Sequence, residues 1–458
     1  MDAVRLNRSV PVLQPFYSGG PFVVSSDGSF MACAFEKSIN IVDSTKSTIM
    51  STLDGDSKHL TVLALSVDDK LLFSSGSSLL VRAWDLSTLE CIHTWEGFKD
   101  YVHCMACHPS GRWLATGGNE GKLRLFDVDS GSYTHGDEVC RQCVSYVMFH
   151  PNPKKKLLFS TSGSGYGLYL ATVEVWVIST GKKMKQIATV DNMCSPLTST
   201  SIAVSEDGNT LLSAGRDQVV LLDLSSYSKK TIKTNEEVKA FCVIGAGSPF
   251  ALSLKSCGNI AEEHASSQAL YFITVGERDI VRIWSSESAV CIFEQSMHED
   301  GLAGVFISAL MVANQELLCV TADQEFLFYL QECKSELLEL TLTKRLVGYS
   351  KGVNDMKFIG IDEKFIAVAA NLEQVRVYES SSMSCSYVLF GHQKIVLCLD
   401  TCVSSSGTLI GTGSDDHSVR LWDHKSRSCV GLGIGHNGAV RAIAFSKRKR
   451  DFFVSGSR

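Results

Sequence analysis

Two Cys-x-x-Cys pairs carry the residue types that could bind a metal ion: Cys104 with Cys107, and Cys140 with Cys143. Four thiolates around one ion are a common zinc site. However, the interval between the two pairs is longer than in a usual zinc ribbon. Residues three apart on a strand also point to opposite sides of the sheet. We therefore expect free thiols, with no metal ion and no other cofactor.

Catalytic and phosphate-binding motifs are missing from the sequence. No Gly-x-Ser-x-Gly elbow stands where a strand would turn into a helix. The glycine-rich run 163–167 has no Lys-Ser or Lys-Thr pair after it, so it does not match a phosphate-binding loop. We expect no catalytic residues, no enzyme activity and no small-molecule substrate.

Two runs of consecutive cations are candidates for contact with nucleic acid. For the first run, 154–156, a solvated turn between two strands is the simpler interpretation. The second run has four members, which could attract RNA phosphate or act as a nuclear import signal: Lys447, Arg448, Lys449 and Arg450. The net charge of the whole chain is −6, so RNA binding over its entire surface is not expected.

Composition indicates a folded protein with a large core, because 45% of the 458 residues are hydrophobic and 20% are charged. No apolar stretch follows Arg5 and Arg8, and the apolar window 301–313 is too short to span a bilayer. Most of the 16 cysteines lie in apolar runs, as free thiols do in a reducing compartment. We expect a soluble, intracellular chain with no disulfides and no membrane contact.

These candidate residues are embedded in a repeat that runs along the whole chain. Short β-rich runs recur, and most end in a bulky side chain followed by a polar one. They end at Val42, Trp84, Phe126, Trp176, Leu222, Trp284, Tyr329, Tyr378 and Trp422. The mean spacing of roughly 47 residues is close to the roughly 40–45 of WD repeats, which form the four-stranded blades of a β-propeller. The sequence therefore predicts an all-β WD40 propeller.

The clearest repeat runs from Gly391 to Asp423. We predict that four of its residues form a buried, hydrogen-bonded chain that stabilises the blade: His392, Thr412, Asp416 and Trp422. In other repeats the aromatic residue of the third strand is expected to wedge between neighbouring blades. These residues are Trp84, Phe126, Trp176, Trp284 and Tyr378.

The number of repeats predicts how the domains are organised. Nine third strands are present, with the start of a tenth repeat at 435–458. Propellers have about four to eight blades, so one ring of nine or ten is the less favoured alternative. We predict an N-terminal segment at 1–16, a seven-bladed propeller at 17–347 and an incomplete second propeller at 348–458. An unclosed ring would expose strand edges, which suggests a fragment or a truncated form.

Several short stretches resemble one family of nucleolar WD-repeat proteins. They are Pro15–Gly20, Ala214–Asp217, Gly348–Ser350 and Gly391–Asp400. In their order and spacing the chain is similar to the transducin-β-like subunits of the small-subunit processome, which belong to its UTP-B subcomplex. The resemblance covers essentially the whole chain.

The resemblance implies two tandem seven-bladed propellers and a helical C-terminal domain, of which this chain lacks much of the second propeller and the last domain. It also implies a non-catalytic scaffold in the nucleolus. The expected partners are other UTP-B proteins and, directly or indirectly, U-three small nucleolar RNA or pre-ribosomal RNA. The expected role is pre-rRNA processing and assembly of the small ribosomal subunit.

Two other classes of WD protein remain as alternatives. A substrate receptor of a cullin ubiquitin ligase commonly carries Arg two places after the Trp-Asp pair. The corresponding residues here are Ser87, Asp129 and Lys425, which weakens this alternative. A G-protein-β-like signalling subunit would need an N-terminal coiled coil, and residues 1–15 are too short and unpatterned to form one.

Overall fold

The computed structural model describes residues 15–46, 48–57, 59–140, 143–162, 170–178, 184–194, 202–215, 217–234, 236–245, 247–256, 270–276, 280–297, 306–313, 315–334, 337–348, 352–382, 384–404, 407–446 and 453–457. These residues form strands β1 to β38 and one helix, α1. The chain divides into two compact units. The first runs between Phe16 and Lys344, and the second holds the chain from Arg345 onward.

The first unit consists of seven four-stranded antiparallel sheets, each made of four consecutive strands. Their bounds are β1 Phe22–Val24, β2 Phe30–Phe35, β3 Ser38–Asp43, β4 Thr48–Leu53; β5 Leu60–Leu65, β6 Leu71–Gly76, β7 Val81–Asp85, β8 Glu90–Trp95; β9 Val102–Cys107, β10 Trp113–Gly118, β11 Lys122–Asp127, β12 Tyr133–Val139; β13 Val144–Phe149, β14 Leu157–Ser162, β15 Leu170–Ile178, β16 Met184–Cys194; β17 Ile202–Val204, β18 Thr210–Ala214, β19 Gln218–Asp223, β20 Lys229–Lys233; β21 Val238–Ile244, β22 Tyr271–Gly276, β23 Ile280–Ser285, β24 Cys291–Ser296; and β25 Phe306–Val312, β26 Glu316–Thr321, β27 Glu325–Lys334, β28 Leu337–Val347. We number the sheets 1 to 7 in this order.

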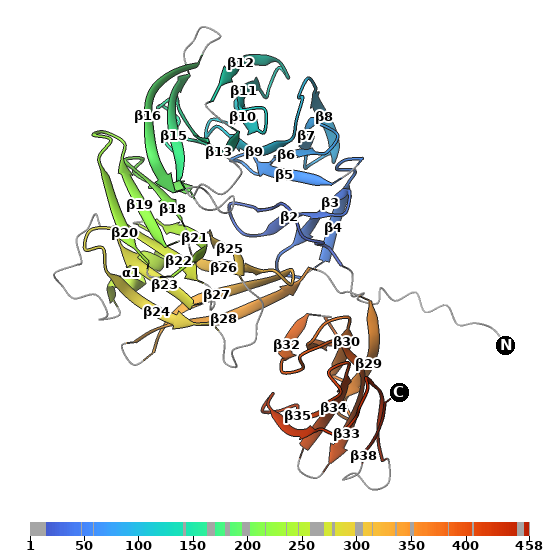
Figure 1. Cartoon of the computed structure of the whole chain (residues 1–458). Coiled ribbons are helices and arrows are strands. Elements are labelled where there is room, and N and C mark those ends of the chain that lie inside the picture. The colour runs from blue at the N-terminus through green and yellow to red at the C-terminus, as the bar shows by residue number, and fades with distance from the viewer. Residues whose placement is uncertain are drawn as a thin grey trace. The chain divides into compact units, whose positions relative to one another are not determined.

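The seven sheets are arranged around a common centre like the blades of a propeller (Figure 1). The first strand of every sheet is innermost and lines one central cavity. The fourth strand of each sheet is outermost. The prediction of an all-β propeller is therefore confirmed for this part of the chain.

The turns between first and second strands show why the sequence repeats fold in this way. Ser25, Ser66 and Ser205 each follow the first strand of a sheet. Each hydroxyl donates to the carboxylate two residues later and accepts the backbone N–H five residues later. Such serine turns satisfy the backbone where the ladder stops and reverse the chain. The same local chemistry thus ends the inner strand in three sheets.

The hydrophobic core lies between neighbouring sheets rather than inside any one of them. One cluster joins Ala32 and Ile41 of sheet 1 to Leu63, Leu72 and Trp84 of sheet 2. A single blade has two apolar faces, and each face is buried only when another blade covers it. The propeller is therefore stabilised by stacking around the ring.

Aromatic packing closes the ring between sheet 7 and sheet 1. Tyr17 and Phe22 meet Phe326 of β27 edge-on, with ring centroids 5.2 and 5.3 Å apart. Phe16 also contacts Phe326, and its carbonyl accepts a hydrogen bond from Asn40 at 3.1 Å. Among the described strands, none is exchanged between the first and last sheets, because each sheet contains only consecutive strands.

The second unit has two four-stranded sheets and one two-stranded sheet, numbered 8 to 10. Their strands are β29 Val353–Ile359, β30 Phe365–Ala370, β31 Val375–Glu379, β32 Cys385–Leu389; β33 Val396–Ser404, β34 Gly407–Ser414, β35 Val419–Asp423, β36 Cys429–Gly433; and β37 Val440–Phe445, β38 Phe453–Ser457. Aspartate side chains connect the inner strands of neighbouring sheets. Asp355 accepts a hydrogen bond from the N–H of Leu399 at 3.0 Å, and Asp400 accepts one from the N–H of Phe445 at 2.8 Å.

One helix departs from the sequence-based picture. The repeat pattern predicts strands and turns with no helix, yet α1 spans Pro249–Ser256. Most of the polar insertion at 255–268, which is predicted to be a loop, lies outside the described residues. Ser248 caps it by accepting the N–H of Ala251 at 3.1 Å, and proline suits the first helical position. Phe250, Ala251 and Leu254 bury the helix against sheets 6 and 7. The Ser-Pro pair is the signal that could have revealed it.

Candidate functional site

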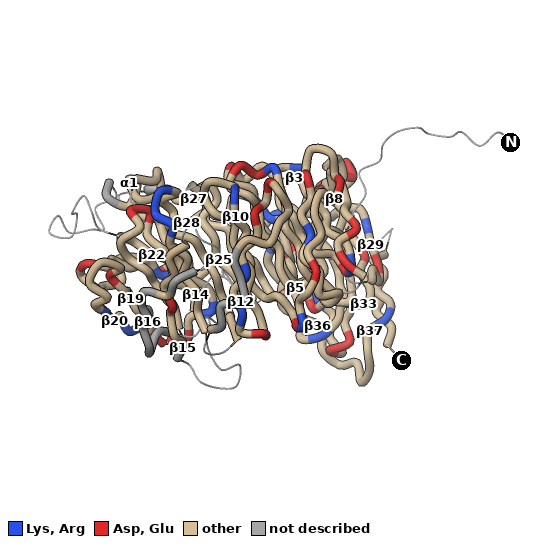
Figure 2. Tube along the Cα trace, turned by 90° about the horizontal axis from the view of Figure 1, so that it is seen from above, with Lys and Arg blue, Asp and Glu red and all other residues tan. Residues whose placement is uncertain are grey.

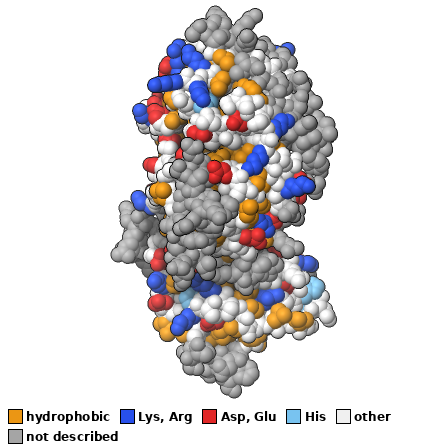
Figure 3. Space-filling view, turned by 90° about the vertical axis from the view of Figure 1, so that its left-hand side faces the viewer, with side chains coloured by type: hydrophobic (Ala, Val, Ile, Leu, Met, Phe, Trp, Pro, Cys, Tyr) orange, Lys and Arg blue, Asp and Glu red, His pale blue; other side chains and the backbone are white. Residues whose placement is uncertain are grey.

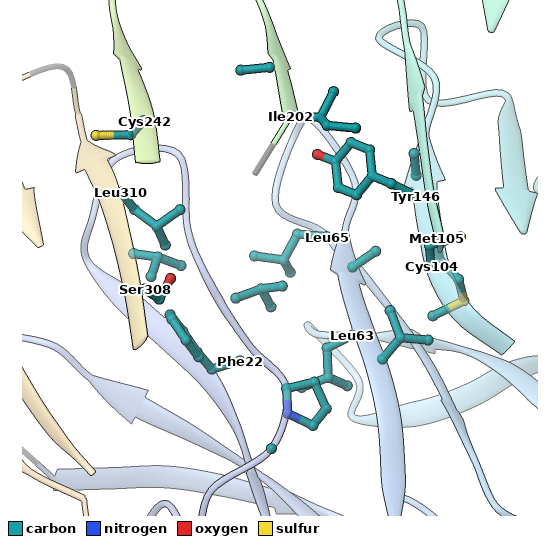
Figure 4. A pocket seen from close by; sticks show the side chains of 18 of the residues that line it. Phe22, Leu63, Leu65, Cys104, Met105, Tyr146, Ile202, Cys242, Ser308 and Leu310 are labelled. Atoms are coloured by element: carbon teal, nitrogen blue, oxygen red, sulfur yellow. The ribbon is translucent and has the colours of Figure 1, made fainter. Parts of the chain in front are cut away.

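The central cavity of the first propeller is a candidate binding site, with a volume of about 960 Å³. All seven innermost strands contribute to its wall. Phe22, Leu63, Tyr146, Ile202 and Leu310 lie around it (Figure 4). None of the described residues that line it is Asp, Glu, Lys or Arg. The cavity therefore offers apolar contact and a few hydroxyl, imidazole and thiol groups.

The thiols in this cavity are poorly suited to nucleophilic chemistry. Burial raises the pKa of Cys242 to about 12, and it raises the pKa of Cys104 further. A cysteine attacks as its thiolate, which is scarce at neutral pH under these conditions. Burial likewise raises the pKa of the Tyr146 phenol to about 12. These groups can bind as neutral donors or acceptors.

The aromatic residues predicted to wedge between blades lie in the third strands and are buried. Trp84, Phe126, Trp176, Trp284 and Tyr378 each have 7% or less of their surface exposed. Phe126 packs on sheet 2, Trp176 on sheet 3 and Trp284 on sheet 5, each against the preceding blade. Tyr378 contacts mainly residues of its own sheet 8 and Val347.

The third-strand tryptophans all have the same type of polar partner, a serine or threonine hydroxyl. The indole N–H of Trp84, Trp176, Trp284 and Trp422 donates to a hydroxyl on the adjacent second strand, at 2.8, 2.8, 2.8 and 2.9 Å. The acceptors are Ser74, Ser160, Thr274 and Thr412. A buried indole N–H needs such a partner, so the Trp and the hydroxyl residue form one unit.

The structure brings the four residues of the predicted chain in sheet 9 together. Trp422 donates to Thr412, whose hydroxyl lies 2.8 Å from Nε2 of His392. Nδ1 of His392 lies 2.9 Å from Asp416. All four groups are satisfied when the His392 proton is on Nδ1 and Thr412 donates to Nε2. His392 is neutral in this arrangement.

Burial and hydrogen bonds set the protonation of the histidine and the aspartate. Burial lowers the pKa of His392, and the neighbouring Asp416 only partly offsets this effect. Burial alone would raise the pKa of Asp416. Hydrogen bonds from Ser418, the Gln393 N–H and His392 outweigh burial and hold the pKa well below its usual range. The pair therefore consists of an anion and a neutral imidazole at pH 7.

Sheet 4 carries a different version of this arrangement, which the sequence did not reveal. Cys140 precedes the inner strand by four residues, as His392 does in sheet 9. Ser160 accepts from Trp176 and donates to Glu174 at 3.1 Å, and Glu174 is only 1% exposed. Burial and a hydrogen bond to Glu174 raise the pKa of the Cys140 thiol. A thiol thus stands at the position of the histidine, and the carboxylate comes from the third strand, at the position of Arg420 in sheet 9.

The two Cys-x-x-Cys pairs do not form a metal centre among the described residues. Cys104 and Cys140 are buried, whereas Cys107 and Cys143 are partly exposed, and all four are free thiols. Within each pair the two cysteines therefore differ in environment. No described group of three or more His, Cys, Asp or Glu side chains is arranged to hold a metal ion.

The two basic runs have different positions in the structure. Residues 154–156 lie between β13 and β14 and are exposed. The predicted RNA or import patch, Lys447 to Arg450, lies outside the described residues. Lys and Arg are interspersed with Asp and Glu along the trace, and one face shows both signs among apolar and polar side chains (Figures 2 and 3). Among the described helices, none is long and apolar enough to cross a membrane.

Comparison with known proteins identifies the repeat. The family model described as "WD domain, G-beta repeat" matches residues 89–127 and 383–423. The first match covers β8 to β11, and the second covers the β32 to β35 region that holds the tetrad of His392, Thr412, Asp416 and Trp422.

Relatives extend the similarity to nearly the whole chain. Transducin beta-like protein 3 of Rattus norvegicus is 31% identical over 97% of this chain and 53% of its own length. The Homo sapiens protein of that name is 30% identical over 97% of this chain and 52% of its own. U3 small nucleolar RNA-associated protein 13 of Saccharomyces cerevisiae is 23% identical over 97% and 55%. The chain spans about half the length of these curated relatives.

Proposed function

Because the chain is a WD-repeat propeller protein related to the transducin beta-like proteins, we propose that it is a non-catalytic scaffold of the small-subunit processome. In this role it supports pre-rRNA processing and assembly of the small ribosomal subunit. The observation that carries the proposal is similarity over 97% of the chain to transducin beta-like protein 3 and to a protein named for its association with U3 small nucleolar RNA.

The architecture is suited to this role. Ten sheets present short loops at their rims, and such loops on a rigid frame are common sites of partner binding. The described cavity thiols are held protonated, and the buried histidine of sheet 9 is fully hydrogen-bonded within its blade. These groups support the fold, which agrees with binding rather than catalysis.

Several finer assignments belong to the same proposal. We assign 17–347 to a first seven-bladed propeller and 348–458 to part of a second, with 1–16 as an N-terminal segment. We also assign His392, Thr412, Asp416 and Trp422 to blade stability. The partners would be other UTP-B proteins, with U3 small nucleolar RNA or pre-rRNA contacted directly or through them, in the nucleolus. Residues 447–450 are proposed as an import or RNA-binding signal.

Affinity purification of the tagged full chain from cells tests the proposal. We expect recovery of processome proteins together with U3 RNA, measured by mass spectrometry and by RNA sequencing. Recovery of ubiquitin-ligase components without processome proteins would contradict it. A variant with alanine at 447–450 separates import from assembly: a cytoplasmic variant that still binds processome proteins in extracts indicates an import signal.

A further inference from the structure

We propose that the exposed basic turn of sheet 4, together with Arg112 and Trp113 of sheet 3, binds the phosphodiester backbone of RNA. The residues of this basic patch are Arg112, Trp113, Lys154, Lys155 and Lys156. The proposal deepens the processome function above by giving the chain a direct RNA contact, and it rests on that function for its biological meaning. It concerns different residues from the run at 447–450.

Two cations converge on one half-buried aromatic ring in this patch. The guanidinium carbon of Arg112 lies 5.6 Å from the centre of the Trp113 ring, and Nζ of Lys156 lies 5.8 Å from it. Arg112 also pairs with Asp127 at 3.1 Å, but 62% of its side chain stays exposed. Cations beside an aromatic ring are the elements that bind nucleic-acid backbone and a stacked base.

The three lysines are presented by an ordered turn. The N–H of Lys154 donates to the Asn152 side chain at 3.0 Å, and that of Lys155 donates to the Asn152 carbonyl at 3.0 Å. Asn152 is itself held by the buried His150, whose Nε2 lies 2.9 Å from the Gly208 carbonyl in sheet 5. An ordered turn loses less conformational entropy when it binds than a flexible one would.

The neighbouring turns confine the positive charge to sheets 3 and 4. The corresponding turn of sheet 2 carries Asp68 and Asp69, and that of sheet 5 carries Glu206 and Asp207. Hydrogen bonds connect turns of neighbouring sheets along the rim. The N–H of Ser26 in sheet 1 donates to Asp69 in sheet 2, and Nε2 of His150 in sheet 4 lies at hydrogen-bond distance from the Gly208 carbonyl in sheet 5. A polyanion would be attracted to the basic sector and repelled on either side, which sets where it can cross the rim.

Two buried histidines, His108 and His150, lie close enough to the lysines of the patch to be affected by their charge. Burial lowers the pKa of His108, and Lys156 lowers it further. Burial also lowers the pKa of His150, where Lys155 contributes in the same direction despite the nearby Asp207. Nε2 of His108 is buried without a hydrogen-bond partner among the described residues. A bound phosphate would offset the lysine charge felt by both rings.

RNA fits these observations better than an acidic protein does. An acidic peptide would need only the cations, whereas RNA also uses the ring of Trp113 by stacking. RNA further supplies closely spaced phosphates that can engage adjacent lysines. An acidic polypeptide is therefore the competing occupant, and the experiment includes it.

The test measures binding of a fluorescently labelled, mixed-sequence single-stranded RNA to the full chain by anisotropy at several salt concentrations. Replacing Lys154, Lys155 and Lys156 together with alanine should weaken binding at least about tenfold at low salt. Each phosphate contact on a single strand contributes about −0.7 to the slope of log K against log salt. The variant's slope should therefore be about 2 units shallower.

Matched control variants distinguish an effect of the basic patch on RNA binding from an effect of the net charge of the chain. Alanine at Lys46, Lys70 and Lys99 removes the same charge from exposed lysines outside the patch, and two of these already face carboxylates. That variant should bind RNA like the parent. Arginine at 154–156 should restore binding, and ultraviolet crosslinking should place RNA on peptides that contain 150–156 or Trp113.

Three outcomes would overturn the inference. They are equal loss of binding in both alanine variants, an unchanged salt slope in the 154–156 variant, or competition by polyglutamate as effective as by unlabelled RNA. These outcomes are independent of the processome proposal, which depends on the proteins recovered by affinity purification. A chain that recovers processome proteins but has no patch-dependent RNA binding would refute only the patch.

Discussion

Replacing Thr412 with valine should remove a large part of the stability of sheet 9. Valine keeps the shape of threonine but cannot accept the Trp422 N–H or donate to His392. Thr412 is 0% exposed, Trp422 is 2% exposed and His392 is 6% exposed, so water cannot replace the lost bonds. Each buried group left without its hydrogen bond costs about 1–3 kcal/mol, and two such groups give a loss of about 2–6 kcal/mol.

Hydrogen–deuterium exchange in the full chain can measure this loss locally. Exchange of the backbone N–H groups in β33 to β35 reports the opening free energy of sheet 9, without requiring the two units to unfold together. A second variant, Thr412→Ser, keeps the hydroxyl and loses only a methyl group, at a cost of about 1 kcal/mol. The difference between the two variants isolates the hydrogen bonds.

A double-mutant cycle adds a stricter test. Trp422→Phe removes the indole donor, so Thr412→Val strands only His392 in that background. The double variant should therefore be about 1–2 kcal/mol more stable than the sum of the single losses predicts. If Thr412→Val and Thr412→Ser differ by less than about 0.5 kcal/mol, a range normal for surface substitutions, the hydrogen-bonded chain does not stabilise the blade as argued.

Three further predictions follow from particular contacts. Burial lowers the pKa of His392 despite Asp416, so the unfolded chain takes up a proton more readily than the folded one. Sheet 9 should therefore lose stability as pH falls below about 6.5. The opening free energy of sheet 9, measured by exchange, should depend less on pH in His392→Asn, and an equal dependence would contradict this prediction. Ser248→Ala should cost about 1 kcal/mol in α1, measured by its exchange against β22, and an unchanged rate would refute the cap. A side chain at Gly118 would meet the Tyr101 carbonyl at 2.0 Å, so Gly118→Ala should lower the melting temperature. Gly247→Ala, at a site with nothing within 4 Å, should lower it less.

The sequence predicted features that belong to a single repeat, but not contacts that depend on how neighbouring blades stack. The third-strand aromatics recur from repeat to repeat, and the polar chain of His392 lies in the clearest repeat, so local patterning predicts them. The contact of Lys156 and Arg112 with one ring depends on how two sheets stack, which spacing along the chain does not give. The buried Glu174 was missed because it occupies a position that is Arg in sheets with the usual pattern, such as Arg420.

The same reasoning explains the outcome for the cysteines and for the helix. Alternation along a strand predicted different surroundings for Cys104 and Cys107, and one is buried while the other is partly exposed. Helix α1 was missed because one eight-residue segment in a β protein has too little periodicity to be recognised.

The aromatic closure of the first ring has a consequence for synthesis and for mechanical load. Phe326 must meet Phe16 and Tyr17, residues roughly 300 positions earlier, before the circle exists. A nascent chain therefore carries an open arc of blades until β27 leaves the ribosome. Because the described strands of sheets 1 and 7 are not shared between the two sheets, side-chain packing around Phe326 resists the separation of the two ends. Under tension applied across the ring, sheets 1 and 7 should separate before the hydrogen-bonded strands within any sheet do.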